Sequence, residues 1–139
     1  MPKAKWFMTI IKAASLSLTL LSLFIGLSLL SKIYDNPQGG QVVSGDVTIT
    51  NPSNTETIIN QSTQSGIINW QSFNVGSGEH THFNQPSANA ITLNRVIGTP
   101  GVASQILGRL TAVGKIMLVN QAGIFFGPNS IVDVAGLIA

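Results

Sequence analysis

The stretch GKIMLVNQAGIFFG, residues 114–127, places a strand-length apolar run, a polar turn and a second short apolar run in immediate succession. The same alternation follows at once, with a turn at residues 128–130 and a short apolar run at residues 131–134. Strands this short leave backbone groups and apolar faces unpaired when they stand alone. We therefore expect them to be rungs of a stack, in which each pass of the chain covers the pass before it.

Short runs with strand patterning also fill the chain before residue 114. Residues 41–50 alternate, with Val43, Gly45, Val47 and Ile49 on one side, which is the period of a half-buried strand. Turn-forming residues 51–54 are expected to end this strand. The other predicted strands lie within residues 56–61, 66–73, 79–84 and 88–96. Residues 104–110 favour a bend between strands, so the chain after residue 32 is predicted to be all-β.

A weak periodicity accompanies these strands. Asparagines at predicted strand ends occur at positions 69, 94 and 120, with separations of 25 and 26 residues. Such separations are in the range for one coil of a β-solenoid, in which stacked asparagines can hydrogen-bond along the axis. This spacing alone is not evidence for a β-solenoid, because asparagine is abundant in the chain and could produce it by chance.

The composition fits a β-protein with a neutral polar surface. Only 9% of the 139 residues are charged, and this length corresponds to a single domain. The net positive charge comes from Lys3, Lys5 and Lys12, because from Asn36 onward three basic residues face four acidic ones. The folded part lacks the basic patch that nucleic-acid binding needs, so nucleic acid is not expected as a partner. The absence of cysteine excludes disulfides and thiolate metal sites.

Residues 1–31 have the three-part layout of a signal peptide, which predicts an N-terminal hydrophobic signal helix. The lysines precede an uncharged, leucine-rich run at residues 13–30, which is long for a signal and close to the shortest membrane-spanning helix. We favour a cleaved signal over an uncleaved anchor. The small residues that cleavage requires are available at Gly26-Leu27-Ser28 or near Ser31.

The β-domain is predicted to occupy residues 32–139. Its last segment, residues 134–139, is an apolar strand without a polar cap. Because such a strand leaves the final coil of a stack uncovered, we expect the domain to be incomplete at its C-terminus and poorly soluble when expressed alone.

Few residues suggest catalytic or metal chemistry. On a strand, His80 and His82 share one face while Glu79 points to the other. Two imidazoles do not complete a zinc site, so no metal or other cofactor is expected. The acids at positions 46, 56, 79 and 133 are scattered singly, and no nucleophile or phosphate-binding motif occurs, so the chain is not predicted to be an enzyme. Trp70 and Phe73 are expected to pack in apolar layers rather than to bind a ligand.

Several segments together resemble the N-terminal two-partner secretion domain of filamentous-haemagglutinin-like exoproteins, also called the haemagglutination activity domain. The likeness runs in consistent order from about residue 37 to residue 139. The matching stretches are QVVSG at 41–45, GIINWQSFNVG at 66–76, VGSGEHTHFN at 75–84, NRVIG at 94–98, SQILGRL at 104–110, the stretch quoted first, and residues 129–139.

This resemblance implies a right-handed parallel β-helix, or β-solenoid, in a protein exported from a Gram-negative cell. In that family the domain passes to the periplasm and is recognised there by a dedicated outer-membrane transporter barrel. It then emerges at the cell surface or is secreted, and it nucleates folding of the β-helix that follows. Low charge and the lack of disulfides suit a chain that is threaded unfolded and driven outward by stacking rather than by ATP.

The resemblance places the family's Asn-Pro-Asn-Gly turn at Asn120, Gln121, Ala122 and Gly123. The first and last residues match, whereas the middle two do not. Gly123 is expected to provide a backbone geometry that is costly for other residues, and Asn120 is expected to hydrogen-bond within its own turn. These four residues are candidates either for recognition by the transporter or for a turn that β-helix folding requires.

Two other functions stay open. The first is a direct glycan- or cell-binding module of haemagglutinin type, which needs an exposed aromatic or charged patch, and only Trp70, Tyr34 and a few phenylalanines are available for one. The second, less favoured, is a polysaccharide-active β-helix enzyme. Such an enzyme would need three carboxylates within about 6 Å of one another, a separation at which they perturb each other strongly.

Overall fold

The computed structural model describes residues 35–139, and every regular element in this range is a strand. The strands are β1 (Gln41–Ser44), β2 (Val47–Ser53), β3 (Glu56–Gln61), β4 (Ser65–Trp70), β5 (His80–Asn84), β6 (Ile91–Val96), β7 (Ser104–Ile106), β8 (Arg109–Ala112), β9 (Lys115–Val119), β10 (Ile124–Phe126), β11 (Ile131–Asp133) and β12 (Gly136–Ile138). The all-β prediction is confirmed for the described part. Nothing in residues 35–139 is a helix long and apolar enough to cross a membrane. The predicted signal helix lies outside the described residues.

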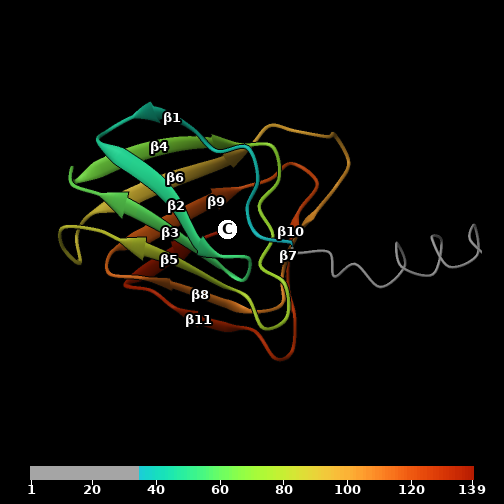
Figure 1. The fold of residues 1–139 in the computed structure, drawn as a ribbon. Helices are drawn as coiled ribbons and strands as arrows, with labels where there is room; N and C mark the ends of the chain where they lie inside the picture. Colours follow the sequence, from blue (N-terminus) through green and yellow to red (C-terminus); the bar gives the residue numbers. More distant parts are fainter. Residues whose placement is uncertain (1–34) are drawn as a thin grey trace, which may run out of the picture. The chain divides into compact units, whose positions relative to one another are not determined.

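The strands form three sheets that together make a β-solenoid of about three turns (Figure 1). Sheet I has the order β1-β4-β6-β9-β12, sheet II has the order β11-β8-β5-β3-β2, and sheet III pairs β10 with β7. Among the strands from β3 onward all of the pairings are parallel, and β5, β6, β8 and β9 each pair with strands of both the preceding and the following coil. The predicted stack of rungs is therefore confirmed, with β9 lying between β6 and β12.

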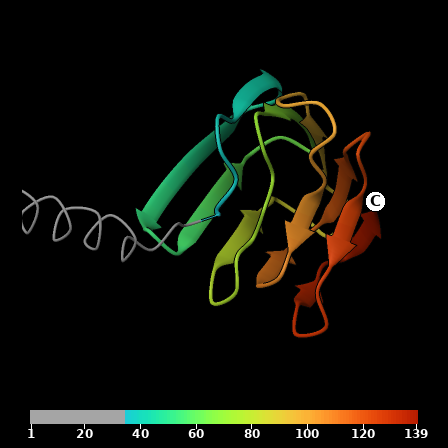
Figure 2. The same ribbon diagram turned by 90° about the vertical axis from the view of Figure 1, so that its right-hand side faces the viewer.

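The first coil is covered by two antiparallel strands. β1 pairs with β4, and β2 pairs with β3, both in antiparallel register. Figure 2 shows these strands at one end of the fold and the later coils following them in chain order. This N-terminal cap supplies hydrogen-bond partners to the edges of β3 and β4, which are otherwise open at the start of a stack.

The cap corrects two details of the predicted strand at residues 41–50. That segment forms two strands, because Gly45 takes a left-handed conformation with φ of 88° between β1 and β2. Residues 51–53 continue β2 instead of ending it. The register shifts between Thr50 and Ser53, and Pro52, which has no N–H to donate, is tolerated because β2 is an edge strand.

The core is a column of apolar side chains that point inward from all three sheets. Its widest part contains Trp70, Phe73 and Phe83, each at most 1% exposed. The rings of Trp70 and Phe73 meet edge to face at 5.5 Å, and those of Phe73 and Phe83 stack at 6.4 Å. Such pairs add about 0.5–1.5 kcal/mol each beyond the burial of their area. The prediction that Trp70 and Phe73 pack in apolar layers is confirmed.

The spaced asparagines at 69, 94 and 120 do not stack on one another. Asn69 lies beside Arg95 and points outward, whereas Asn94 points inward and is fully buried. Asn120 lies after β9 in a turn. Asn94 instead accepts a hydrogen bond from the indole Nε1 of Trp70 at 2.9 Å, which satisfies the polar atom of a buried aromatic.

A repeated glutamine, rather than asparagine, ties successive coils together. The dipeptide Asn-Gln occurs at positions 60–61, 84–85 and 120–121, and the first two copies stand where β3 and β5 end side by side. Nε2 of Gln61 donates to the backbone carbonyl of Ile91, and Nε2 of Gln85 donates to that of Lys115. Each glutamine thus reaches the first residue of a sheet I strand one coil further on. We call Gln61 and Gln85 the corner glutamines.

Two neighbouring buried threonines give a test of how polar groups are tolerated in this core. Thr57 and Thr81 lie side by side in sheet II and are both fully buried. The Thr57 hydroxyl donates to Oδ1 of Asn51 at 2.9 Å, whereas the Thr81 hydroxyl has no hydrogen-bond partner within residues 35–139. A buried polar group without a partner costs roughly 1–3 kcal/mol.

Thr81→Val is therefore expected to raise the free energy of unfolding by about 1 kcal/mol, because a methyl group replaces an unsatisfied hydroxyl. Thr57→Val is the matched control and is expected to lower it by about 1–2 kcal/mol, because Asn51 loses its donor. Urea unfolding of the purified chain measures both. Equal losses from the two substitutions would show that the Thr81 hydroxyl is satisfied in solution.

Candidate functional site

The turn at residues 120–123 has the geometry that its sequence predicts. The N–H of Gly123 donates to the carbonyl of Asn120 at 2.9 Å, which closes a four-residue turn between β9 and β10. Gly123 has φ of 99°, a conformation that residues with a Cβ rarely adopt. Oδ1 of Asn120 accepts the N–H of Ala122 at 2.9 Å, as expected for an asparagine that opens a turn. Asparagine first and glycine last is the pattern of a type I turn.

Asn120 also anchors the turn to the preceding coil. Its Nδ2 donates to the carbonyl of Val102 and to Oγ of Ser104, both at 3.0 Å. The N–H of Ser104, a fully buried residue, donates in turn to the carbonyl of Gly123. The side chain of Asn120 therefore holds the position of the turn, while Gln121 is exposed to solvent.

A groove of about 520 Å³ borders the exposed side of the turn. One wall is formed by residues 119–122 and the other by residues 95–101, which lead away from the end of β6. Ile97 and Val119 are 55% and 46% exposed at this groove. The turn thus lies beside apolar surface and the guanidinium of Arg95, which gives a contacting protein both apolar and charged groups to bind.

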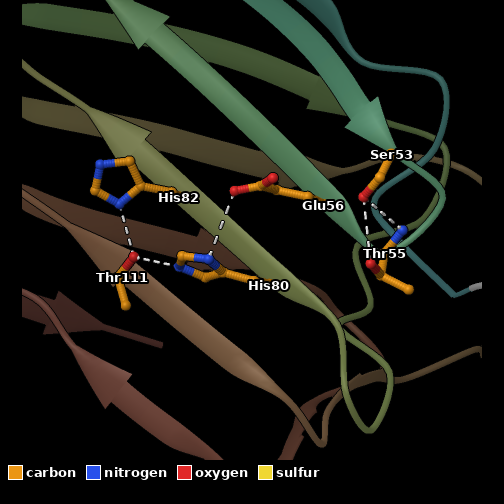
Figure 3. Close-up of polar contacts among 6 residues, drawn as sticks. All are labelled: Ser53, Thr55, Glu56, His80, His82 and Thr111. Atoms are coloured by element: carbon orange, nitrogen blue, oxygen red, sulfur yellow. Dashed lines mark hydrogen bonds and ion pairs between the residues drawn. The ribbon is translucent and has the colours of Figure 1, made fainter.

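The two histidines lie together on the outer face of sheet II, as predicted (Figure 3). Glu79 points inward and is buried. Nε2 of His80 and Nδ1 of His82 both lie within hydrogen-bond distance of Oγ1 of Thr111, at 2.7 and 2.6 Å. A hydroxyl has one proton to donate and two lone pairs that accept, so the direction of each bond depends on which ring nitrogen of the histidine carries the proton.

The surroundings of His80 favour its neutral form. Partial burial lowers the pKa of His80, the positive charge of Arg109 and that of protonated His82 lower it further, and Glu56 opposes these effects. Nδ1 of His80 lies 3.9 Å from Oε1 of Glu56. No three His, Cys, Asp or Glu side chains within residues 35–139 form a group that could hold a metal ion.

Glu79 performs a structural task at the start of the folded part. Its carboxylate is 3% exposed; Oε1 accepts the N–H of Asp35 at 2.9 Å and Oε2 accepts the N–H of Gly76 at 2.7 Å. Two backbone donors partly compensate for burial of the carboxylate. Glu79 therefore links the segment before β1 to the loop before β5.

The residues considered for glycan binding are mostly in the core. Trp70 is 1% exposed, and Tyr34 lies outside the described residues. Phe125, on β10, is the most exposed aromatic of the described part, at 54%. The acids at 46, 56 and 79 each interact with a different neighbour. Asp46 accepts a hydrogen bond from the hydroxyl of Ser62, while Glu56 and Glu79 make the contacts given above.

The contacts of Asn120 with the preceding coil and the corner glutamines are the features that sequence reasoning missed. The expectation for Asn120 named its bond within the turn and not its contacts with Val102 and Ser104. A partial sequence signal existed for the glutamines: Asn-Gln recurs after 24 residues, which is the register offset between β3 and β5, but it also occurs at 120–121, where Gln121 is exposed. No sequence pattern signals the contact of Asn120 with Val102, because that contact depends on how the loop before β7 folds back.

Comparison with known proteins places this geometry in a family. A family model described as the TPS secretion domain matches residues 33–139. A heme/hemopexin-binding protein of Haemophilus influenzae (strain ATCC 51907 / DSM 11121 / KW20 / Rd) is 40% identical over 124 residues, which cover 89% of this chain and 13% of that protein. A second Haemophilus influenzae protein of that name is 41% identical over 105 residues, covering 76% of this chain and 11% of the relative. This chain thus spans a small fraction of the length of these relatives.

A solved structure agrees with the sequence comparisons. The crystal structure of the HMW1 secretion domain from Haemophilus influenzae matches with a TM-score of 0.67 at 34% identity, covering 73% of this chain and 26% of that chain. TPS domains are parts of exoproteins that cross the outer membrane by two-partner secretion with a cognate transporter, and theirs is not an enzyme family. With the family model matched over nearly the whole described part, this chain belongs to the TPS secretion domain family.

Proposed function

We propose that residues 32–139 are the secretion-targeting and folding-nucleus part of a large adhesin-like protein, recognised by its own outer-membrane transporter and delivered to the cell surface or the medium. Residues 1–31 act before this step as the signal for transfer to the periplasm. The observation that carries the proposal is the order of pairing. An antiparallel cap comes first in the chain, and each later coil pairs in parallel with a coil already formed.

This order suits a chain that leaves the transporter with its N-terminal part first. The cap and first coil give a finished edge, and each new coil closes only a short loop to reach it, so the entropic cost per step is small. Burial and hydrogen bonding outside the cell then favour outward movement. The lack of cysteine means that no oxidation step has to accompany folding.

Within this function, the turn at residues 120–123 is the recognition surface, with Asn120 as the residue that fixes its shape. Gln121 and Ala122 are exposed, and the groove beside them gives the turn an accessible flank. The contacts of Asn120 with Val102 and Ser104 favour an indirect role, because they position the turn rather than present a side chain to a partner.

Ala122→Arg separates recognition from folding. Residue 122 is exposed, so we expect the melting temperature to stay unchanged while the amount of chain secreted with the cognate transporter falls by about tenfold, corresponding to about 1.4 kcal/mol of lost binding. Asn120→Ala is the companion variant and is expected to lower both quantities, because three hydrogen bonds are lost. Normal secretion of the Ala122→Arg chain would limit the turn to a role in folding.

A further inference from the structure

The chain segment that precedes β1 is fastened to two successive coils, the first formed by β3 and β4 and the second by β5 and β6. The N–H of Gln38 donates to the carbonyl of Ser72, just after β4, at 2.9 Å. The N–H of Asp35 donates to Oε1 of Glu79, 44 residues further on, at 2.9 Å. Glu79 directly precedes β5, and its side chain is buried. The start of the folded part therefore cannot take its final place until the second coil begins to form.

The largest buried side chains bridge the same two coils. Trp70 ends β4, Phe73 follows it in the chain, and Phe83 lies on β5. The ring of Phe73 lies 5.5 Å from that of Trp70 and 6.4 Å from that of Phe83. Of the residues that the structure describes, these three are the largest that are fully buried. A first coil without β5 would leave this aromatic cluster open to water, so the hydrophobic gain from burying it comes only with the second coil.

Buried polar atoms of the first coil also take their partners from the second coil. Nε1 of Trp70 donates to Oδ1 of Asn94 at 2.9 Å, and Oγ1 of Thr92 donates to Oε1 of Gln61 at 2.7 Å. Asn94 and Thr92 lie on β6 and are fully buried. Hydrogen bonds of this kind strengthen when water is excluded from both partners. They therefore favour burial of β4 and β6 in one step rather than one after the other.

The strands after β6 enlarge this unit, but none of the contacts described above depends on them. Their fully buried apolar side chains are aliphatic and lie on β7, β8 and β9: Ile106, Leu110, Ile116 and Leu118. No residue of β10, β11 or β12 is buried. The later strands thus add core to an edge that the first two coils have already formed.

Chain length indicates the same boundary. The cap and the first coil, residues 35–73, amount to about 40 residues, near the length below which domains usually need disulfides, metals or oligomerisation. The chain has no cysteine to supply a disulfide. Residues 35–96, which end with β6, amount to about 60 residues, a length at which many domains fold unaided. The second coil therefore brings the chain to a size at which burial can outweigh the lost chain entropy.

We propose that folding begins only when the cap and the first two coils, residues 35–96, are available together, and that the strands after β6 join this unit afterwards. The inference rests on the proposed function and deepens it, because it sets the point at which folding starts to favour outward movement. About 60 residues have to leave the transporter before that point. The edge formed by the cap and the first coil is stable only when the second coil covers it, so movement of a shorter segment gains nothing from folding.

Two matched core substitutions in the full chain test this order. Ile68 on β4 and Ile116 on β9 are both fully buried, and valine at either position shortens the side chain by one carbon. We expect Ile68→Val to slow refolding from urea about threefold and to change the unfolding rate by less than about 1.5-fold. Ile116→Val is expected to raise the unfolding rate about threefold and to change refolding by less than about 1.5-fold. Equal slowing of refolding by the two variants would overturn the proposal.

Hydrogen exchange of the wild-type chain in low concentrations of urea gives a second measurement that needs no variant. We expect the amides of β9 to exchange through a partial opening of the fold, whereas those of β4 and β6 exchange only when the whole domain unfolds. Exchange of the β4 and β6 amides before those of β9 would overturn the proposal, because the first two coils would then be the less stable part.

Secretion with the cognate transporter separates this inference from the proposed function. If the wild-type chain is not secreted with its transporter, the proposed function fails, while the refolding rates still decide where folding begins. If it is secreted, we expect Ile68→Val to slow the appearance of folded chain outside the cell about threefold, and Ile116→Val to slow it by less than about 1.5-fold. Equal secretion rates for the two variants would show that formation of residues 35–96 does not set outward movement.

Discussion

Replacing Gln85 with leucine is expected to lower the free energy of unfolding by about 3–5 kcal/mol. Leucine keeps most of the side-chain volume, so the loss of stability measures the contribution of the hydrogen bonds that Gln85 makes. Oε1 of Gln85 accepts the N–H of Gly114 at 2.7 Å, and Nε2 donates to the Thr92 hydroxyl and to the carbonyl of Lys115. Gly114 is buried, so its N–H would be left without water or a protein partner.

Gln105→Leu is the control for this change. Gln105 is exposed, and its side chain makes no hydrogen bond within residues 35–139, so its replacement should alter stability by less than about 0.5 kcal/mol. Urea unfolding of the purified chains measures both variants. A loss below about 1 kcal/mol for Gln85→Leu would mean that water reaches this corner and replaces the glutamine.

Gly108→Ala is expected to cost about 4 kcal/mol or more, enough to prevent folding of a marginally stable domain. Gly108 lies at the bend between β7 and β8, and a methyl group there would overlap the backbone carbonyl oxygens of Gly76 and Glu79 in the preceding coil. Backbone atoms cannot rotate away as a side chain does, so the coils would have to separate and lose their hydrogen bonds.

Gly101→Ala separates this overlap from the general cost of replacing glycine. Gly101 has φ of 79°, and nothing lies within 4 Å of the position where a Cβ would be. Alanine there should cost only the backbone strain, about 1–2 kcal/mol. Far-UV circular dichroism and urea unfolding report both variants. A folded Gly108→Ala chain with the stability of Gly101→Ala would show that the coils can move apart at this corner.

The pattern of the strands was the part of the fold that the sequence made predictable. Short apolar runs separated by turns in residues 114–134 predicted stacked rungs, and the register of β9 between β6 and β12 confirms this. Local alternation also placed His80 and His82 on one face correctly. These are properties of a single strand, where the side-chain period decides the answer.

Features that depend on two coils at once could not be derived in the same way. The antiparallel cap requires knowing which strands β1 and β2 meet, and periodicity is the same for either orientation. The asparagine spacing failed because the register offsets along sheet I are 26 residues between β4 and β6 and 24 between β6 and β9, so Asn69 meets Arg95 and Asn94 meets Leu118. Equal spacing in sequence therefore does not mean equal position in the stack.

The corner glutamines have a consequence for how the fold resists force. Each donates towards the coil that comes later in the chain, so the coils that contain β3 and β5 are each tied to their successor at one corner as well as through their sheets. Tension applied from the C-terminal side would peel the coils away singly: β11 and β12 would part first, held by sheet pairing, and the two coils before them would each also break the bond of one corner glutamine. Tension applied from the N-terminal side would meet the cap first, where β1 and β2 must be sheared or unzipped from their antiparallel partners before any coil is exposed. The resistance of the solenoid to force therefore differs between its ends. It unfolds coil by coil from the C-terminal end, and it has to lose its antiparallel cap first at the N-terminal end.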